Sequence, residues 1–286
     1  MTLRQRLTTP DILIAPGVYD GLTAALATDA GFEALYLSGA AVAYTRLGRP
    51  DIGLSTASEM TDTMALIADR TDLPVIMDAD TGFGNALNAR RTMQSYERAG
   101  ASALQVEDQT YPKKCGHLSD KSLIPKEEMA GKIAAMADAR RHDTLIIART
   151  DAIAVEGFDA AIDRAGSYID AGADVLFIEA PRDSGELSRI ADTFKGRVPL
   201  LANMVEGGAT PISSATMLED MGFDIVIFPG GIVRALAKSA QDYYASLKAT
   251  GSNKAFSDRM HDFDGLNAAI GTPEMLALGK RFDGKS

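Results

Sequence analysis

The stretch PVIMDAD at residues 74–80 is a short apolar run that ends in two acidic residues. Near-continuous apolar runs of this kind are typical of strands that are buried on both faces of a parallel sheet. Seven more runs share this pattern, and segments of helical period separate them. These expected strands are ILIAPG (12–17), ALYLSG (34–39), ALQVED (103–108), LIIART (145–150), VLFIEA (175–180), PLLANM (199–204) and IVIFPG (225–230).

The eight strand–helix pairs predict an α/β protein of the (β/α)8 TIM-barrel type. The alternative is a doubly wound sheet, which would carry a Gly-rich phosphate turn after an early strand, and no G-x-G-x-x-G or Walker sequence stands there. We expect residues 1–286 to form one barrel domain in which 251–286 is a helical extension. The barrel needs no element from 254–282, so we expect this segment to pack outside it or to reach a neighbouring subunit.

Composition disfavours several classes of partner. The formal net charge of -10 disfavours nucleic acids and anionic membranes, because binding to either needs concentrated Lys and Arg. No apolar run approaches the roughly 20 residues that cross a bilayer, and the N-terminal sequence lacks a secretory signal pattern. A single cysteine excludes a disulfide framework. We therefore expect a cytoplasmic protein, for which small anionic molecules remain candidate ligands.

The expected strands end in chemically active residues, which a barrel brings to one rim. Asp78 and Asp80 are two residues apart on one strand, so they face the same side, and Glu107 lies near the end of the next strand. These carboxylates predict a site for Mg2+ or Mn2+ rather than zinc, with Asp51 as a candidate outer ligand. The alternative is that such acids cap the helices that follow. Arg149, on another expected strand, suits a bidentate grip on a substrate carboxylate.

The only cysteine, Cys115, lies in the loop sequence YPKKCGHLSDKS at 111–122. An isolated cysteine is most often a small buried apolar residue. Here Lys113, Lys114 and His117 would lower the pKa of the thiol, which predicts a group that exchanges a proton near neutral pH. A nucleophilic thiol with His117 as its base is the rival role. The two lysines also offer positive charge for substrate carboxylates.

Four motifs stand in order along the chain, namely DADTGFG (78–84), VEDQ (106–109), KKCGH (113–117) and ARTDA (148–152). Together they resemble the isocitrate lyase/phosphoenolpyruvate mutase superfamily, and Lys-Lys-Cys-Gly-His is the signature of its lyase branch, which includes methylisocitrate and dimethylmalate lyases. The similarity runs from about residue 10 to residue 250. It implies a (β/α)8 barrel, a Mg2+ cofactor and, in many members, a homotetramer whose subunits exchange a C-terminal helix.

The resemblance also implies roles for single residues. Asp80 resembles the direct metal ligand, while Asp51, Asp78 and Glu107 resemble residues that hold the metal's water ligands. The other implied roles are substrate-carboxylate binding by Arg149 and by the backbone N–H groups of Ser38, Gly39 and Ala40; help in removing the substrate hydroxyl proton by Tyr36 and Glu179; further substrate contacts by Lys113, Gly116, Asn203 and His117; and proton donation from a mobile loop by Cys115.

The resemblance implies a Mg2+-dependent lyase that breaks a carbon–carbon bond. Its substrate would be a 2-substituted malate, such as a 2-alkylmalate or a methylisocitrate-like acid, and its products an α-keto acid such as pyruvate and a carboxylic acid. Methylisocitrate lyases carry an Arg-x-Glu-Leu-Tyr sequence where this chain reads HDFDGLNAAIG (261–271), with Phe263 near the arginine position. A third substrate carboxylate would then lack a partner, which favours the smaller 2-alkylmalates.

Three alternatives use the same scaffold. An enzyme like carboxyphosphoenolpyruvate mutase would act on a phosphorus–carbon bond, but phosphonate enzymes of the superfamily generally have a different loop in place of Cys-Gly-His. Decarboxylation or hydrolysis of oxaloacetate would need only the metal half of the site. A sensor of dicarboxylates would keep the charged rim, but it would have no need of an acid on a mobile loop.

Overall fold

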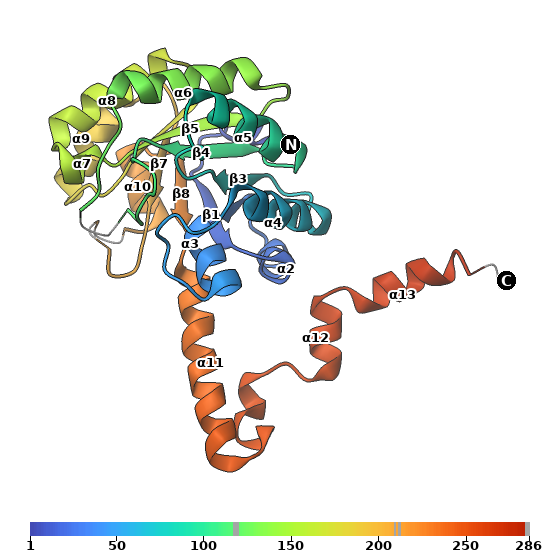
Figure 1. Cartoon of the computed structure of the whole chain (residues 1–286). Coiled ribbons are helices and arrows are strands. Elements are labelled where there is room, and N and C mark those ends of the chain that lie inside the picture. Colours follow the sequence, from blue (N-terminus) through green and yellow to red (C-terminus); the bar gives the residue numbers. More distant parts are fainter. Residues whose placement is uncertain (117–119, 209, 211–212, 284–286) are drawn as a thin grey trace. The chain divides into compact units, whose positions relative to one another are not determined.

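A computed structural model describes residues 1–283 except 117–119, 209 and 211–212. Its first part is a closed barrel of eight parallel strands, β1 to β8 in chain order, with helices around it (Figure 1). The strands are β1 (Leu13–Val18), β2 (Leu35–Leu37), β3 (Val75–Asp78), β4 (Ala103–Glu107), β5 (Leu145–Thr150), β6 (Val175–Ile178), β7 (Leu200–Asn203) and β8 (Ile225–Phe228). The predicted (β/α)8 barrel is confirmed, and each expected strand agrees with the structure to within two residues at either end.

The barrel closes between its first and last strands. β1 and β8 pair in parallel from Leu13↔Ile225 to Pro16↔Phe228. Every residue of β3, β4, β5 and β6 is buried, because the strands have the barrel interior on one side and helices on the other. This double burial explains why these sequences are mostly apolar rather than alternating between apolar and polar residues.

Helices cover the barrel, and all of them except α1, which precedes β1, come after strands. They are α1 (Leu3–Arg6), α2 (Gly21–Asp29), α3 (Gly39–Val42), a π-helix (Ala43–Leu47), α4 (Ala57–Arg70), α5 (Ala86–Arg98), α6 (Lys126–Ala139), α7 (Ala152–Val155), α8 (Phe158–Asp170), α9 (Ser184–Phe194) and α10 (Ala215–Met221). Thr56 and Asn85 cap α4 and α5 through side-chain oxygens that accept backbone N–H groups. Two of the segments of helical period in the sequence, 86–99 and 156–171, correspond to α5 and α8. Among the described residues, none of the helices has both the length and the apolar composition that crossing a membrane requires.

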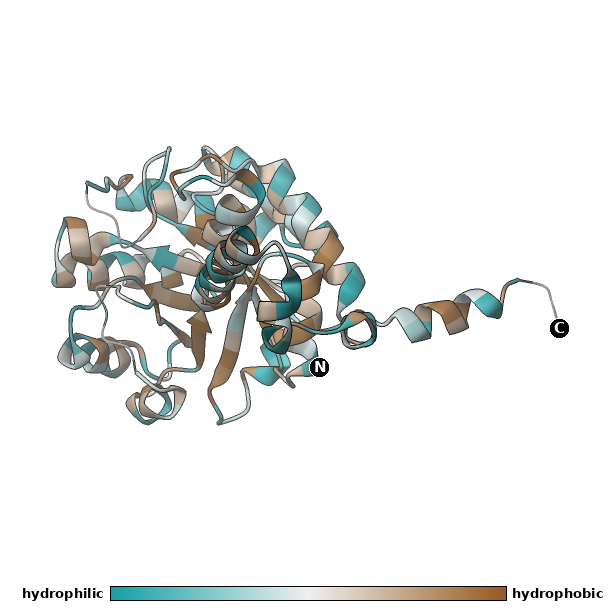
Figure 2. Ribbon diagram, turned by 90° about the horizontal axis from the view of Figure 1, so that it is seen from below, coloured by the Kyte–Doolittle hydropathy of each residue, from teal (hydrophilic) through white to brown (hydrophobic). Residues whose placement is uncertain are grey.

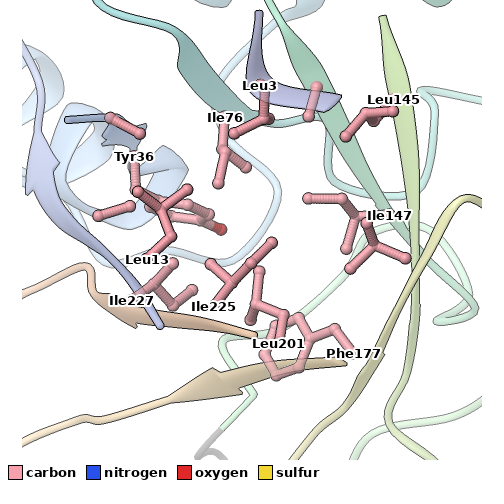
Figure 3. Close-up of a cluster of buried hydrophobic side chains, with 14 residues drawn as sticks. Leu3, Leu13, Tyr36, Ile76, Leu145, Ile147, Phe177, Leu201, Ile225 and Ile227 are labelled. Carbon is pink, nitrogen blue, oxygen red and sulfur yellow. The ribbon is translucent and has the colours of Figure 1, made fainter. Parts of the chain in front are cut away.

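Apolar side chains fill the barrel interior (Figure 3). They come from all eight strands and include Ile76, Ile147, Phe177 and Ile225, and α1 adds Leu3, which is 1% exposed. Burial of a leucine, isoleucine or phenylalanine side chain contributes about 1.5–3 kcal/mol to stability. This core holds the strands in fixed register, and their carboxyl ends therefore present side chains at fixed positions.

The chain divides into two compact units, Met1–Gly231 and Ile232–Ser286. The helices beyond the barrel are α11 (Gly231–Thr250), a 3-10 helix (Asn253–Arg259), α12 (Phe263–Ala269) and α13 (Thr272–Lys280). One barrel domain with an extension from residue 251 stays a prediction. The division between the compact units lies earlier than residue 251, because α11 belongs almost entirely to the second unit.

Aromatic residues join α11 to the 3-10 helix inside this second unit. The rings of Tyr243 and Phe256 are 5.5 Å apart, and the Arg259 guanidinium lies 4.3 Å from the centre of the Phe256 ring. By contrast, α12 and α13 contain no buried residue, and Figure 2 shows apolar residues (brown) on α13. Phe263 is 82% exposed and Met275 is 67% exposed. Exposed apolar surface of this kind is typical of a region that contacts another protein.

Candidate active site

Three carboxylates lie at neighbouring strand ends of the barrel. Asp78 ends β3, Asp80 follows two residues later and Glu107 ends β4, and all three side chains are buried. Asp80 has a φ of 46°, a region that Asp adopts more readily than most residues, and its carbonyl oxygen accepts a hydrogen bond from Glu107 N at 2.9 Å. The cap of the following helix, α5, is Asn85. The alternative that Asp80 caps this helix is therefore wrong.

Lys113 brings a positive charge into this acidic cluster. Its Nζ lies 2.6 Å from Asp51 Oδ1 and 2.8 Å from Asp80 Oδ1, and the residue is 4% exposed. Burial raises the pKa of Asp80 to about 6, although the Lys113 charge acts in the opposite direction. Burial acts to lower the pKa of Lys113, but the charges of Asp80 and Asp51 outweigh it and hold this pKa well above its usual value. The ammonium group thus compensates the carboxylates, and a substrate contact by Lys113 stays a prediction.

The predicted metal ligands Asp51, Asp78, Asp80 and Glu107 are all buried carboxylates. Within the part of the chain that the structure describes, no group of three His, Cys, Asp or Glu side chains is arranged to hold a metal ion. The donor chemistry nevertheless fits Mg2+, which prefers oxygen ligands and keeps several waters. Glu107 Oε1 is a buried oxygen that accepts no hydrogen bond from any described residue. Burial raises the pKa of Glu107 well above its usual value, so a cation beside it would favour its ionised form.

Arg149 of β5 is buried among acidic residues. Its Nε lies 2.9 Å from Asp151 Oδ2 and 3.3 Å from Glu107 Oε2, and its Nη2 lies 3.8 Å from Glu179 Oε1. Lys121 Nζ contacts the other oxygen of Asp151 at 2.7 Å. Burial alone would raise the pKa of Asp151, but Arg149 and Lys121 lower it to about 2. The guanidinium is therefore held at the rim in its charged form, as a carboxylate-binding role requires.

Asp108 is a structural residue rather than a second rim acid. Its carboxylate accepts hydrogen bonds from Thr150 Oγ1 at 2.7 Å and from Tyr168 OH at 2.8 Å. It also accepts one from Asp151 N at 3.0 Å, and Arg164 Nη1 lies 3.4 Å away. Tyr168 and Arg164 belong to α8, so the fully buried Asp108 joins the ends of two strands to an outer helix.

We expect Asp108→Ala to lower the free energy of unfolding by about 3–5 kcal/mol, because it leaves buried partners without their acceptor. Urea unfolding followed by circular dichroism measures this change. The matched control is Asp159→Ala, since the Asp159 side chain is 93% exposed in an ion pair with Arg189 and its loss should change stability little. Equal effects of the two substitutions would contradict the structural role of Asp108.

The expected carboxylate-binding turn lies at the start of α3. Ser38 caps this helix with its side chain, and its own N–H donates to Val18 O at 3.1 Å. Ser38 N–H is therefore already used. Of the three expected backbone donors, only the N–H groups of Gly39 and Ala40, in the first turn of α3, have no acceptor within the helix. A Cβ on Gly39 would lie 2.9 Å from Asp78 Oδ2, so the lack of a side chain there lets the turn approach the acidic cluster.

Tyr36 and Glu179 are the two residues expected to help in removing a substrate proton. The Tyr36 hydroxyl donates a hydrogen bond to Gln105 Oε1 at 2.6 Å. Burial raises the pKa of Tyr36 well above its usual value, and the charge of Asp78 raises it further, so the phenol stays neutral near pH 7. Asn203 Nδ2 lies 3.4 and 3.3 Å from the two carboxylate oxygens of Glu179. The structure thus places Asn203, a predicted substrate contact, next to Glu179.

We call residues 109–124 the cysteine loop. Cys115 is half-buried in this loop, and its N–H donates to Asp51 O at 3.1 Å. The loops that follow β2 and β4 therefore meet, as expected if both serve the site. His117, the predicted substrate contact and rival base, lies outside the described residues.

Gly116 packs the cysteine loop directly onto the charged rim. A Cβ at this position would lie 2.3 Å from Glu179 Oε1 and 2.4 Å from Arg149 Nη2, so no other residue fits without movement. The Gly116 carbonyl accepts a hydrogen bond from Lys121 Nζ, the group that also contacts Asp151. The residue next to Cys115 is therefore in contact with two predicted catalytic groups.

Sequence reasoning misses three residues that organise this region: Gln105, Gln109 and Lys121. Gln109 accepts a hydrogen bond from Lys114 N at 3.0 Å and donates one to Lys114 O at 2.8 Å, which fixes the cysteine loop. A signal existed for Gln105, because it is a polar residue inside an expected buried strand. Lys121 carries no such signal, because its partners belong to distant segments of the chain.

A closed parallel barrel with buried carboxylates and a buried arginine at its rim defines a (β/α)8-barrel enzyme. The sequence pattern of the family described as "Phosphoenolpyruvate phosphomutase" matches residues 3–248, and the chain belongs to this family. It is 42% identical over 270 residues to the 2,3-dimethylmalate lyase of Eubacterium barkeri, covering 94% of this chain and 93% of that protein. It is 47% identical over 261 residues to the 2-methylisocitrate lyase of Aeropyrum pernix, covering 91% and 83%. The predicted place in the lyase branch is confirmed.

Solved structures agree with this assignment. A crystal structure of 2,3-dimethylmalate lyase has a TM-score of 0.93 at 36% identity, covering 99% of this chain and 97% of that one. Oxaloacetate acetylhydrolase in complex with 3,3-difluorooxalacetate has a TM-score of 0.94 at 32% identity, covering 100% and 97%. A phosphonopyruvate hydrolase complex with oxalate and Mg2+ has a TM-score of 0.88 at 31% identity, covering 99% of each chain.

Proposed function

We propose that this protein is a Mg2+- or Mn2+-dependent lyase that cleaves a 2-substituted malate into an α-keto acid, such as pyruvate, and a carboxylic acid. The observation that carries the proposal is the contact of Gly116 with Arg149 and Glu179, because it brings the loop of Cys115 to the charged rim. Cleavage of such a carbon–carbon bond leaves a carbanion, which needs an acid at that position. The names of the relatives support the same reaction type.

In the proposed reaction, Arg149 and the N–H groups of Gly39 and Ala40 bind the substrate carboxylates. The Glu179 carboxylate accepts the proton of the substrate hydroxyl. The electron pair of that O–H bond forms the new carbonyl, and the pair of the breaking carbon–carbon bond stays on the departing carbon. The Cys115 thiol gives its proton to this carbon, which completes the carboxylic acid. Protons and electrons then balance once Glu179 returns its proton to the thiolate through solvent.

A divalent cation held by Asp80, with Asp51, Asp78 and Glu107 around its waters, would supply positive charge that lowers the pKa of the substrate hydroxyl. Lys113, whose ammonium group contacts Asp51 and Asp80, adds positive charge to the same acidic cluster. The other proposed contacts, from Asn203, His117 and the Ser38 turn, orient the substrate. The cysteine loop excludes water while the carbanion exists.

The proposed assembly is a homotetramer in which the C-terminal helical segment is exchanged between subunits. Its support is the apolar surface of α12 and α13, in which no residue is buried within one chain. The proposed location is the cytoplasm, because a catalytic thiol persists in a reducing compartment. The proposed partner is a small dicarboxylate or tricarboxylate, with no nucleic acid or membrane.

We expect 2-alkylmalates to be the best substrates of the purified protein with Mg2+. Methylisocitrate should have a kcat/KM at least about tenfold lower, because one unpaired substrate carboxylate costs about 1–3 kcal/mol. A coupled dehydrogenase that consumes the α-keto product measures the rates, and removal of the cation with EDTA is the control. Turnover of oxaloacetate or phosphonopyruvate alone would contradict the proposal. Tight binding of malates with no product, seen by calorimetry and mass spectrometry, would instead indicate a sensor.

A further inference from the structure

Gln105 is a polar side chain inside the barrel. It is fully buried on β4, in register with Asp78 of β3. Its Oε1 accepts a hydrogen bond from the Tyr36 hydroxyl at 2.6 Å, and its Nε2 donates to Asp78 Oδ1 at a longer distance, 3.4 Å. One amide therefore connects the acidic cluster to the phenol. Since a buried amide is costly unless it is hydrogen-bonded, these two contacts determine its orientation.

The carboxylate of Asp78 sets the direction of both hydrogen bonds. Asp78 Oδ1 is the acceptor of the hydrogen bond from Gln105, so the NH2 group of Gln105 faces Asp78 and the Gln105 oxygen faces Tyr36. The reversed amide would place its oxygen against the carboxylate, and both groups are acceptors. Asp80 N donates to the same Asp78 oxygen at 3.1 Å, which holds that carboxylate in place. The hydroxyl proton of Tyr36 therefore points to Gln105.

Because the Tyr36 hydroxyl already donates to Gln105, its oxygen can only accept a hydrogen bond from a ligand. The Tyr36 hydroxyl lies beside the acidic cluster, because Gln105, to which it donates, also contacts Asp78 at the end of β3. Figure 3 shows Tyr36 as the polar member of the core cluster. A neutral phenol that already donates its hydrogen bond to Gln105 can accept a hydrogen bond from a ligand O–H group, but it has no second hydrogen bond to donate.

We propose that Gln105 is a positioning residue that makes Tyr36 a hydrogen-bond acceptor toward the bound molecule, so that the site prefers a C2 hydroxyl to a C2 carbonyl. This inference rests on the proposed function and adds to it: Tyr36, which the resemblance implies as a helper in proton removal, only orients the hydroxyl of the bound substrate. That hydroxyl turns its single proton from Tyr36 to Glu179 when the reaction starts. A carbonyl oxygen at the same place would face the lone pairs of the phenol. The α-keto product is therefore bound less tightly than the hydroxy acid, which favours its release.

The test uses lactate and pyruvate as a matched pair, because they differ only in a hydroxyl or a carbonyl at C2. Titration calorimetry with saturating Mg2+ gives the dissociation constant of each for wild type, Gln105→Met, Tyr36→Phe and the double variant. Methionine keeps the size of glutamine and removes both hydrogen bonds, so the phenol can turn its proton to the ligand. We expect Gln105→Met to lower the preference for lactate over pyruvate about tenfold, which corresponds to about 1.4 kcal/mol.

Tyr36→Phe should lower the same preference, and Gln105→Met should then change it no further, because Gln105 acts through Tyr36. The inference is overturned if a folded Gln105→Met variant keeps the wild-type preference, or if its effect persists in the Tyr36→Phe background. If Gln105→Met fails to fold, the Tyr36→Phe variant alone decides. An unchanged preference for lactate over pyruvate in that variant overturns the inference. These measurements need no turnover. If the protein shows the predicted preference but cleaves no malate, that result contradicts only the proposed function.

Discussion

Cys115→Ser is expected to lower kcat for carbon–carbon cleavage by about 10²–10⁴-fold, the usual contribution of a general acid. A serine hydroxyl is nearly the same size as a thiol but is a much weaker acid, so it fills the same position without delivering the proton. Binding of pyruvate with Mg2+ should stay within about threefold of wild type, because no carboxylate contact is lost. The coupled dehydrogenase assay measures kcat, and titration calorimetry measures pyruvate binding.

The control for damage to the cysteine loop is Tyr111→Phe. It removes a hydrogen bond from the Tyr111 hydroxyl to Gly53 O at 3.1 Å in the same loop, and Tyr111 is 59% exposed. Its kcat should remain within a few-fold of wild type. Full turnover by Cys115→Ser would remove Cys115 from the acid role. An equal loss of pyruvate binding would instead show that the substitution disturbs the loop.

Gly116→Ala is expected to lower kcat/KM by about 100-fold or more with little change in thermal stability. The added methyl would lie 2.3 Å from Glu179 Oε1 and 2.4 Å from Arg149 Nη2, far inside van der Waals contact. Both neighbours are buried and held by other groups, so the cysteine loop must move instead, and a displacement of about 1 Å at a reacting group costs about 100-fold. Steady-state kinetics and a thermal melt of the same sample give the two quantities.

The chain offers a matched control in Gly131→Ala. Gly131 lies on α6, and a Cβ there would have no neighbouring atom within 4 Å. The same chemical change should leave kcat/KM unaltered, and in a helix interior it should stabilise the fold slightly. Wild-type kinetics in Gly116→Ala would contradict the view that the loop closes on Arg149 and Glu179.

The barrel could be predicted from the sequence, because strands that are buried on both faces leave a recognisable run of apolar residues. The segment 145–148 is apolar throughout, and the limits expected for its strand, 145–150, coincide with those of β5. The rim residues could also be found, since a polar residue at the end of a buried strand stands out. The division at Ile232 could not be predicted, because it falls at the start of α11, a helix that follows β8 just as other helices follow the earlier strands.

Contacts between loops are the part of the site that sequence does not reveal. The VEDQ motif contains Gln109, but nothing in the sequence says that its side chain holds Lys114. Lys113 was expected to meet a substrate, whereas in the structure its ammonium group lies between Asp51 and Asp80. Both contacts depend on how separate loops fold against one another, and local patterns carry no information about that.

The pairing of Leu13 with Ile225 has a consequence for how this protein is made. Roughly 210 residues separate the two partners, and at about 5–20 residues per second a ribosome needs about 10–40 s to synthesise them. Throughout that interval β1 lacks its second neighbour, and apolar surface stays in contact with solvent. We therefore expect the nascent chain to depend on chaperones, and faster translation or their depletion to send more of it into aggregates.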